Sequence, residues 1–148
     1  MYFVGSFLLF TLYNFSSNLI TSEKKMKKYY PALPAFSFAM EPEILKGKVS
    51  RLIESLIVRG AKFFYRTATG KEVDGIFTNK KIIPVDVKYI DALRIKNVPG
   101  LFSFMNRHGV KKGYVVTRYF AGKLKKNDKV VEAIPLLEWM LRRDGLRH

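Results

Sequence analysis

Two short charged runs on either side of a turn carry the residue types best suited to chemistry in this chain. Glu72 and Asp74 precede the turn, and Asp86 and Lys88 follow it. All four have even numbers, and residues two apart on a strand point to the same face. Facing carboxylates repel, and Mg²⁺ removes that repulsion because it binds carboxylate and phosphate oxygens. The pattern predicts a divalent metal site beside a lysine.

The turn between the runs sets which residues face each other. If residues 78–81 form the turn, the hairpin places Asp74 opposite Asp86 and Glu72 opposite Lys88. Cβ atoms at such positions lie roughly 4.5–5.5 Å apart. The hairpin alone leaves a second interpretation open, a solvated face with a Glu72–Lys88 ion pair worth roughly a few tenths of a kcal/mol.

The odd-numbered positions of both runs are mostly apolar, which is typical of a half-buried antiparallel pair. With Gly75 as the one gap, they are Val73, Phe77, Ile83, Val85 and Val87. A slip of one residue would bury the whole acidic set, so the pattern itself favours this register. We therefore expect a half-buried antiparallel pair with its apolar face in the core.

Helix and strand patterns surround the hairpin. Apolar residues at spacings of three and four predict a helix over Glu41–Gly60, with Glu54 beside the apolar stripe. A short strand is expected at Lys62–Arg66. The later helix, two strands and helix are expected at Pro99–Arg107, Gly113–Thr117, Lys129–Ala133 and Leu136–Arg143.

This order of helix, three meandering strands, helix and strand resembles the PD-(D/E)xK nuclease superfamily. Glu54, Asp74 and the Asp86-x-Lys88 run stand where that pattern has its acids and lysine. The resemblance covers residues 47–117. It implies an α/β fold with a restriction-endonuclease-like core, in which helices flank a mixed central sheet.

The resemblance also implies roles for the residues. The ligands of Mg²⁺ or Mn²⁺ would be Asp74, Asp86, Glu54 and the carbonyl of Val87. Lys88 would be the catalytic lysine, and Glu72 is an extra acid that would act as an outer ligand or hold Lys88. The sequence departs from the pattern at Val73, which replaces the name-giving proline, and at Asp86, which replaces the commoner glutamate.

A second resemblance, to the C-terminal region of archaeal AAA-type ATPases, covers nearly the whole chain. It is carried by residues 7–10, 13–16, 27–30, 54–57, 65–66 and 72–74. In those proteins a nuclease-like module follows a P-loop domain and a winged helix. The present sequence has no Gly-x-x-x-x-Gly-Lys-Ser/Thr run, so a separate ATPase would have to supply that activity.

Charge favours a nucleic-acid partner. Lys and Arg number 27 against 12 Asp and Glu, a net charge of +15, and such an excess attracts polyanions. Contacts to the phosphate backbone are expected from Arg66, Arg94, Lys96, Arg107, Lys111 and Lys112. The function expected is metal-dependent hydrolysis of DNA phosphodiester bonds, with selectivity for DNA structure. The alternative is a non-catalytic nucleic-acid-binding or assembly module that retains the nuclease fold.

The absence of cysteine excludes a disulfide framework, a thiol nucleophile and a zinc–thiolate site. A reducing cytoplasm is the expected location. His108 is interpreted as a cation suited to a helix end, and Tyr30 and Trp139 are interpreted as packing residues.

The first 40 residues are expected to form an apolar segment outside the nuclease-like domain of residues 41–148. Residues 1–22 carry no charge, but polar residues dilute the apolar stretch below the roughly 20 residues of a membrane span. We expect the segment to pack on the core or on the partner of a homodimer, and membrane association is the less favoured interpretation.

Overall fold

The computed structural model describes residues 9–16, 26–32 and 45–142, and the side chains of the third range from residue 50. Its strands are β1 (Leu9–Asn14), β2 (Lys27–Pro31), β3 (Phe63–Arg66), β4 (Glu72–Thr78), β5 (Ile82–Lys88), β6 (Lys112–Thr117), β7 (Gly122–Lys126) and β8 (Lys129–Pro135). Its helices are α4 (Leu45–Val58), α5 (Pro99–Arg107), α6 (Leu136–Arg142) and the 3₁₀ turn η2 (Ile95–Asn97).

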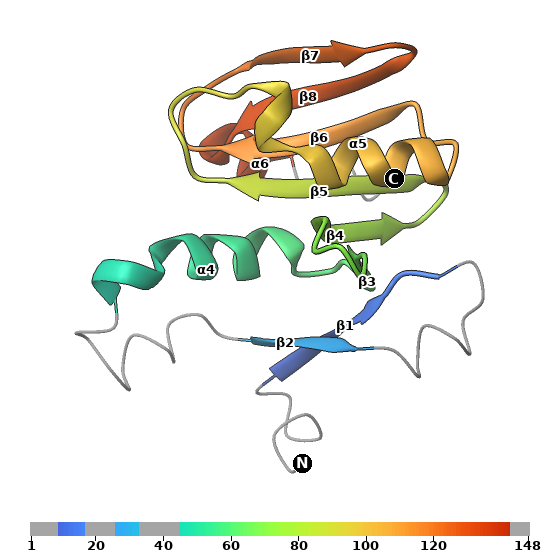
Figure 1. Ribbon diagram of the computed structural model, residues 1–148. Coiled ribbons are helices and arrows are strands. Elements are labelled where there is room, and N and C mark those ends of the chain that lie inside the picture. The colour runs from blue at the N-terminus through green and yellow to red at the C-terminus, as the bar shows by residue number, and fades with distance from the viewer. Residues whose placement is uncertain (1–8, 17–25, 33–44, 143–148) are drawn as a thin grey trace.

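Within these ranges the strands form one mixed sheet in the order β2-β1-β3-β4-β5-β6-β8-β7 (Figure 1). The predicted mixed α/β architecture is confirmed. The bounds predicted for α5 are confirmed, and α4 ends just before Gly60 as expected. Residues 41–44, where that helix was expected to begin, lie outside the described residues. No helix in the described ranges is long and apolar enough to cross a membrane.

The hairpin of β4 and β5 has the register predicted from the sequence. Gly75 pairs with Val85, and Thr78 pairs with Ile82. Regular pairing ends at Gly75 and Val85, so the two strands separate just before they reach the two aspartates. This separation gives the carboxylates space between the strands.

The second interpretation of the hairpin, a solvated acidic face, does not hold for the two aspartates. Only 8% of Asp74 and 2% of Asp86 is exposed. The neighbouring residues Val115 and Val116 of β6 point to opposite faces, and each lies in a different core cluster. One cluster contains residues of α5 and the other contains residues of α4 and α6. Helices therefore cover both faces, as is usual where crossover helices join parallel strands.

A β-bulge in β4 also overturns the expectation that Val73 shares a face with Phe77. The two residues Asp74 and Gly75 lie opposite the single residue Phe64 of β3. Such an extra residue shifts the alternation of side chains along a strand. As a result Val73 packs in the cluster of α5, whereas Phe77 packs against the cluster of α4.

The described parts of the N-terminal segment extend the same sheet. β1 pairs in parallel with β3, and β2 pairs with the other edge of β1. The side chain of Asn14 strengthens this junction, since its amide donates to the carbonyl of Arg66 and accepts from the N–H of Arg66, both at 3.2 Å. The domain boundary predicted at residue 40 lies outside the described residues.

The first turn of α5 lies directly against the start of β4. A Cβ atom added to Gly100 would overlap the backbone of Glu72, so glycine permits an approach that any larger residue would prevent. This contact places α5 beside the end of the sheet where the acidic residues gather.

Candidate functional site

Asp74 and Asp86 meet at the point where β4 and β5 separate. The backbone N–H of Val87 donates to Oδ2 of Asp74 at 2.8 Å, so a carboxylate takes the place of a ladder carbonyl. Burial, followed by the charge of Asp86 and a hydrogen bond with it, raises the pKa of Asp74 well above its usual range. Two buried carboxyl groups this close need a shared proton or a cation between them.

Lys88 supplies one positive charge to this pair. Its Nζ lies 3.1 Å from Oδ2 of Asp86. Burial alone would lower the pKa of Lys88, but the charges of Asp86 and Asp74 outweigh burial and raise it. Lys88 is therefore a cation at neutral pH, held beside two carboxyl groups that it does not fully neutralise.

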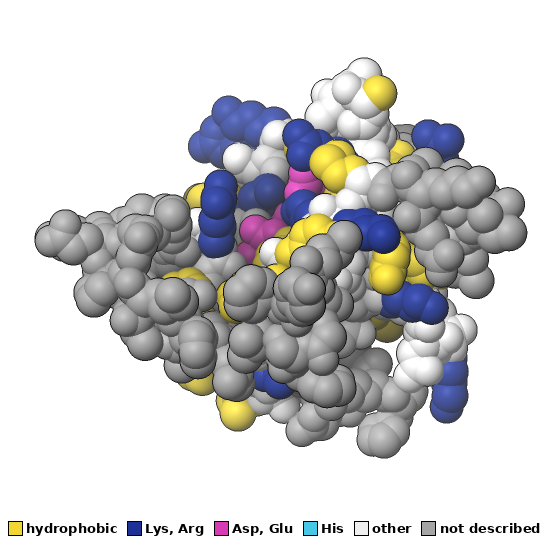
Figure 2. All heavy atoms as spheres, turned by 90° about the horizontal axis from the view of Figure 1, so that it is seen from below, with side chains coloured by type: hydrophobic (Ala, Val, Ile, Leu, Met, Phe, Trp, Pro, Cys, Tyr) yellow, Lys and Arg dark blue, Asp and Glu magenta, His cyan; other side chains and the backbone are white. Residues whose placement is uncertain are grey.

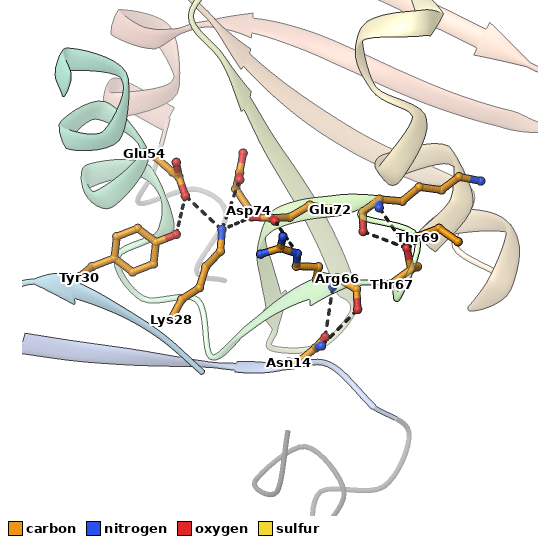
Figure 3. Close-up of polar contacts among 10 residues, drawn as sticks. Asn14, Lys28, Tyr30, Glu54, Arg66, Thr67, Thr69, Glu72 and Asp74 are labelled. Carbon is orange, nitrogen blue, oxygen red and sulfur yellow. Dashed lines mark hydrogen bonds and ion pairs between the residues drawn. The ribbon is translucent and has the colours of Figure 1, made fainter. Parts of the chain in front are cut away.

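A second lysine enters the site from β2. Nζ of Lys28 lies 3.4 Å from Oε1 of Glu54 and 3.8 Å from Oδ1 of Asp74, and it donates a hydrogen bond to Oε1 of Glu72 (Figure 3). Burial opposes the charged form of Lys28, but the hydrogen bond with Glu72 and the nearby carboxylates raise its pKa. Lys28 therefore joins the acids of α4 and β4 through one ammonium group.

Tyr30, two residues further along β2, fixes the acid of α4. Its hydroxyl donates to Oε1 of Glu54, and its ring stacks on Phe10 with centroids 5.3 Å apart. Burial and then the charge of Asp74 raise the pKa of Glu54, while its contacts with Tyr30 and Lys28 work in the opposite direction. Tyr30 is thus a functional neighbour of the acidic cluster as well as the packing residue that was predicted.

The ion pair expected between Glu72 and Lys88 is replaced by other pairs. Glu72 contacts Lys28, and its Oε2 lies 3.6 Å from Nε of Arg66, whereas Lys88 pairs with Asp86. The reason is that β4 and β5 have separated at this level while β2 brings a closer cation. On the side of the molecule drawn in Figure 2, acidic side chains gather in one small patch with Lys and Arg side chains around it.

The chain matches one domain-family model over residues 49–139, and that family is DUF4143, a domain of unknown function. The chain belongs to the DUF4143 family. This family is found at the C-terminus of AAA-type ATPases, which agrees in general terms with the second resemblance. No curated protein and no solved structure matches the chain.

The DUF4143 match contains every predicted acid of the site, and Lys28 and Tyr30 lie outside it. These two are the functional residues that sequence reasoning missed. Their spacing of two places them on one face of a strand, and residues 27–30 also carry the second resemblance. Which residues that face of the strand contacts depends on the pairing of β1 with β3.

The six basic residues predicted to bind nucleic acid are spread over this DUF4143 domain. Lys96 and Arg107 line the same groove beside α5. Lys112 pairs with Glu132 at 2.7 Å, and Arg94 and Lys111 are exposed. Arg66 lies at the acidic cluster. The structure therefore brings together two of the six and distributes the rest.

The donor set of this DUF4143 site suits one divalent cation between Asp74 and Asp86. Mg²⁺ typically takes one or two carboxylates and completes its shell with water or phosphate oxygens. Among the described residues no three Asp, Glu, His or Cys side chains form a ligand group. Glu54 and Glu72 are instead balanced by Lys28 and Arg66, which leaves one acid in excess at the aspartate pair.

Proposed function

We propose that this site hydrolyses phosphodiester bonds of DNA with Mg²⁺ or Mn²⁺ as cofactor. The observation that carries the proposal is the buried pair of Asp74 and Asp86 beside Lys88, at the point where β4 and β5 separate. The element order α4-β3-β4-β5-α5-β6 supports a restriction-endonuclease-like core.

Each residue of the site has a defined part in this proposal. Asp74 and Asp86, with the carbonyl of Val87 and with Glu54 as an outer acid, would hold the metal. A metal in this position supplies a water of lowered pKa and neutralises charge on the phosphate. The Val87 N–H fixes the orientation of Asp74, and the Lys88 ammonium would stabilise the charge that develops on the phosphate oxygens.

One observation favours a second candidate, a non-catalytic nucleic-acid-binding or assembly module working with a separate ATPase. Lys28 and Arg66 balance the charges of Glu54 and Glu72 without any metal. A site balanced by its own lysine needs less charge from a cofactor, as in a domain that keeps the fold after losing the activity. The occurrence of DUF4143 domains on AAA-type ATPases supports the ATPase partner.

A cleavage assay separates the two candidates. Labelled duplex, single-stranded and four-way-junction DNA would be incubated with Mg²⁺, Mn²⁺ or EDTA and with wild type, Asp86→Ala or Lys88→Ala. The matched controls are Asp128→Ala and Lys81→Ala, which change exposed residues of turns outside the site. We expect metal-dependent cleavage that both site variants lose and both controls retain.

Two results would contradict the proposed hydrolysis. Cleavage that survives both site variants would place the activity elsewhere or in a contaminant. Binding of DNA by wild type without cleavage under any metal condition would favour the non-catalytic module.

A further inference from the structure

A groove of about 590 Å³ runs beside α5 and is lined by basic side chains. Its cations come from four parts of the chain: the turn before β4, the connection before α5, the end of α5 and the end of β7. They are Lys71, Lys96, Arg107 and Lys126. Ser103 and Asn106 add polar groups along the same helix.

The positive charge of the groove is uncompensated within the part of the chain that the structure describes. None of the described lining residues is acidic, and no ion pair between described residues engages the four cations. All four are exposed. By contrast, Lys112 and Arg142, which do not line the groove, pair with Glu132 and Glu138.

The groove begins at the end of the sheet that carries the acidic site. Lys71 immediately precedes Glu72, and Lys96 lies in the connection that follows Lys88. Because α5 joins the parallel strands β5 and β6, it runs back from this end (Figure 1). A nine-residue helix is about 13 Å long, a length over which one strand of DNA presents about four phosphates.

We propose that this groove binds the phosphodiester backbone of a nucleic acid next to the acidic site. The lining chemistry fits phosphates, since it combines four cations with small polar groups and carries no acid. Phe102 is 3% exposed beneath Lys126, whose Nζ lies 5.9 Å from the ring centroid, so this ring is not free to stack on bases. Contacts of this kind position a nucleic acid without reading its sequence.

The assignment rests on the proposed function only in naming a nucleic acid, and a binding measurement in EDTA tests it without any cleavage. The variant is Lys96→Gln with Arg107→Gln, and the matched control is Lys80→Gln with Lys81→Gln. The control removes the same charge from the exposed turn at the other end of the β4–β5 hairpin. Thermal melts would verify that both variants fold.

The readout is the affinity for labelled duplex DNA measured across about 50–200 mM salt. Each phosphate contact that is lost lowers the slope of log affinity against log salt by about 0.9. We expect the slope of log affinity against log salt to be smaller by about two in the groove variant than in wild type. The change in affinity across this salt range should therefore be about tenfold smaller in the variant. The control should keep the wild-type slope. A duplex RNA of the same sequence forms the second arm, and a larger loss on RNA would support the groove and identify RNA as its ligand.

Two outcomes would overturn the assignment. One is an equal change of slope in the groove variant and the control, because the binding would then depend on net charge alone. The other comes from polyglutamate, an acidic polymer without phosphates, used as a further ligand. If the groove variant loses binding to polyglutamate as strongly as it loses binding to DNA, the groove accepts any acidic polymer. Failure of wild type to cleave DNA would overturn the proposed hydrolysis and leave the groove assignment standing.

Discussion

In the half of the acidic site near β2, Lys28 and Arg66 balance the charges of Glu54 and Glu72. In the other half, Asp74 and Asp86 face Lys88, and Asp74 also lies 3.8 Å from the shared cation Lys28. The first half has equal numbers of cations and acids, and the second has one acid in excess. The difference shows where an added cation would gain the most favourable interaction.

The two halves also differ in their access to water. The side chains of Glu54 and Glu72 are 21% and 28% exposed, whereas that of Asp86 is 3% exposed. Water screens charges in the first half and does so much less in the second. Repulsion between the aspartates is therefore stronger than their number alone suggests, and variants of Asp86, Lys28 and Asp74 test the two halves.

The largest effect is expected from Asp86→Asn, which removes the excess charge. Affinity for Mn²⁺, measured by calorimetry, should fall strongly, and the proposed cleavage should fall about 1000-fold because a metal site supplies several kcal/mol of transition-state stabilisation. Glu72→Gln, in the balanced half, serves as the control and should cost about tenfold, the scale of an outer residue. Equal losses in both variants would show that the halves act as one site.

Lys28→Met should destabilise the protein because it leaves three acids without their shared cation. We expect a loss of about 1–3 kcal/mol in the free energy of unfolding, less than for a fully buried pair because Lys28 remains partly solvated. Urea denaturation in EDTA measures this change. Adding Glu72→Gln to the variant should restore part of the stability, and strictly additive effects would argue against the contact between the two residues.

Asp74→Asn should stabilise the protein in EDTA, whereas Lys28→Met should destabilise it. Because the folded state raises the pKa of Asp74, the contribution of Asp74 to stability is fully present below the usual aspartate pKa of about 3.9 and is lost as pH rises through the folded value. The variant lacks this loss. Its advantage in Tm should grow between about pH 5 and pH 8 and reach about 3–8 °C. A constant advantage across this range would contradict the raised pKa.

His108 offers the smallest test, at a half-buried site where none of the described carboxylates perturbs its pKa. Its Nε2 is buried without a hydrogen-bond partner in the described structure, and its ring lies 4.5 Å from the ring of Phe104. Burial and then Arg107 lower the pKa of His108. Stability is therefore present above the usual histidine pKa of about 6.5 and is lost as pH falls through the lowered value.

Between about pH 7 and pH 5, wild type should lose about 1–3 °C in Tm more than His108→Phe loses. Differential scanning calorimetry of both proteins measures this difference. Parallel pH profiles would show that His108 titrates alike in the folded and unfolded states, and that burial without nearby acids leaves its protonation unchanged.

Local patterns were enough to predict several features. The parity of the charged residues and the turn predicted at residues 78–81 gave the register of β4 and β5, because a hairpin allows few alternatives. Pro99 at the start and Gly109 just after the end gave the bounds of α5. The bulge at Asp74 could not be predicted, because it depends on the partner strand β3.

By itself, the sequence determined the excess of positive charge, the α/β class and the placement of Asp74, Asp86 and Lys88 on one hairpin. Only the tertiary structure decided that Lys28 meets Glu54 and Glu72, which are 26 and 44 residues away along the chain. That meeting depends on the parallel pairing of β1 with β3. No local periodicity encodes this pairing, because a parallel contact between distant strands is selected by the burial of the whole sheet.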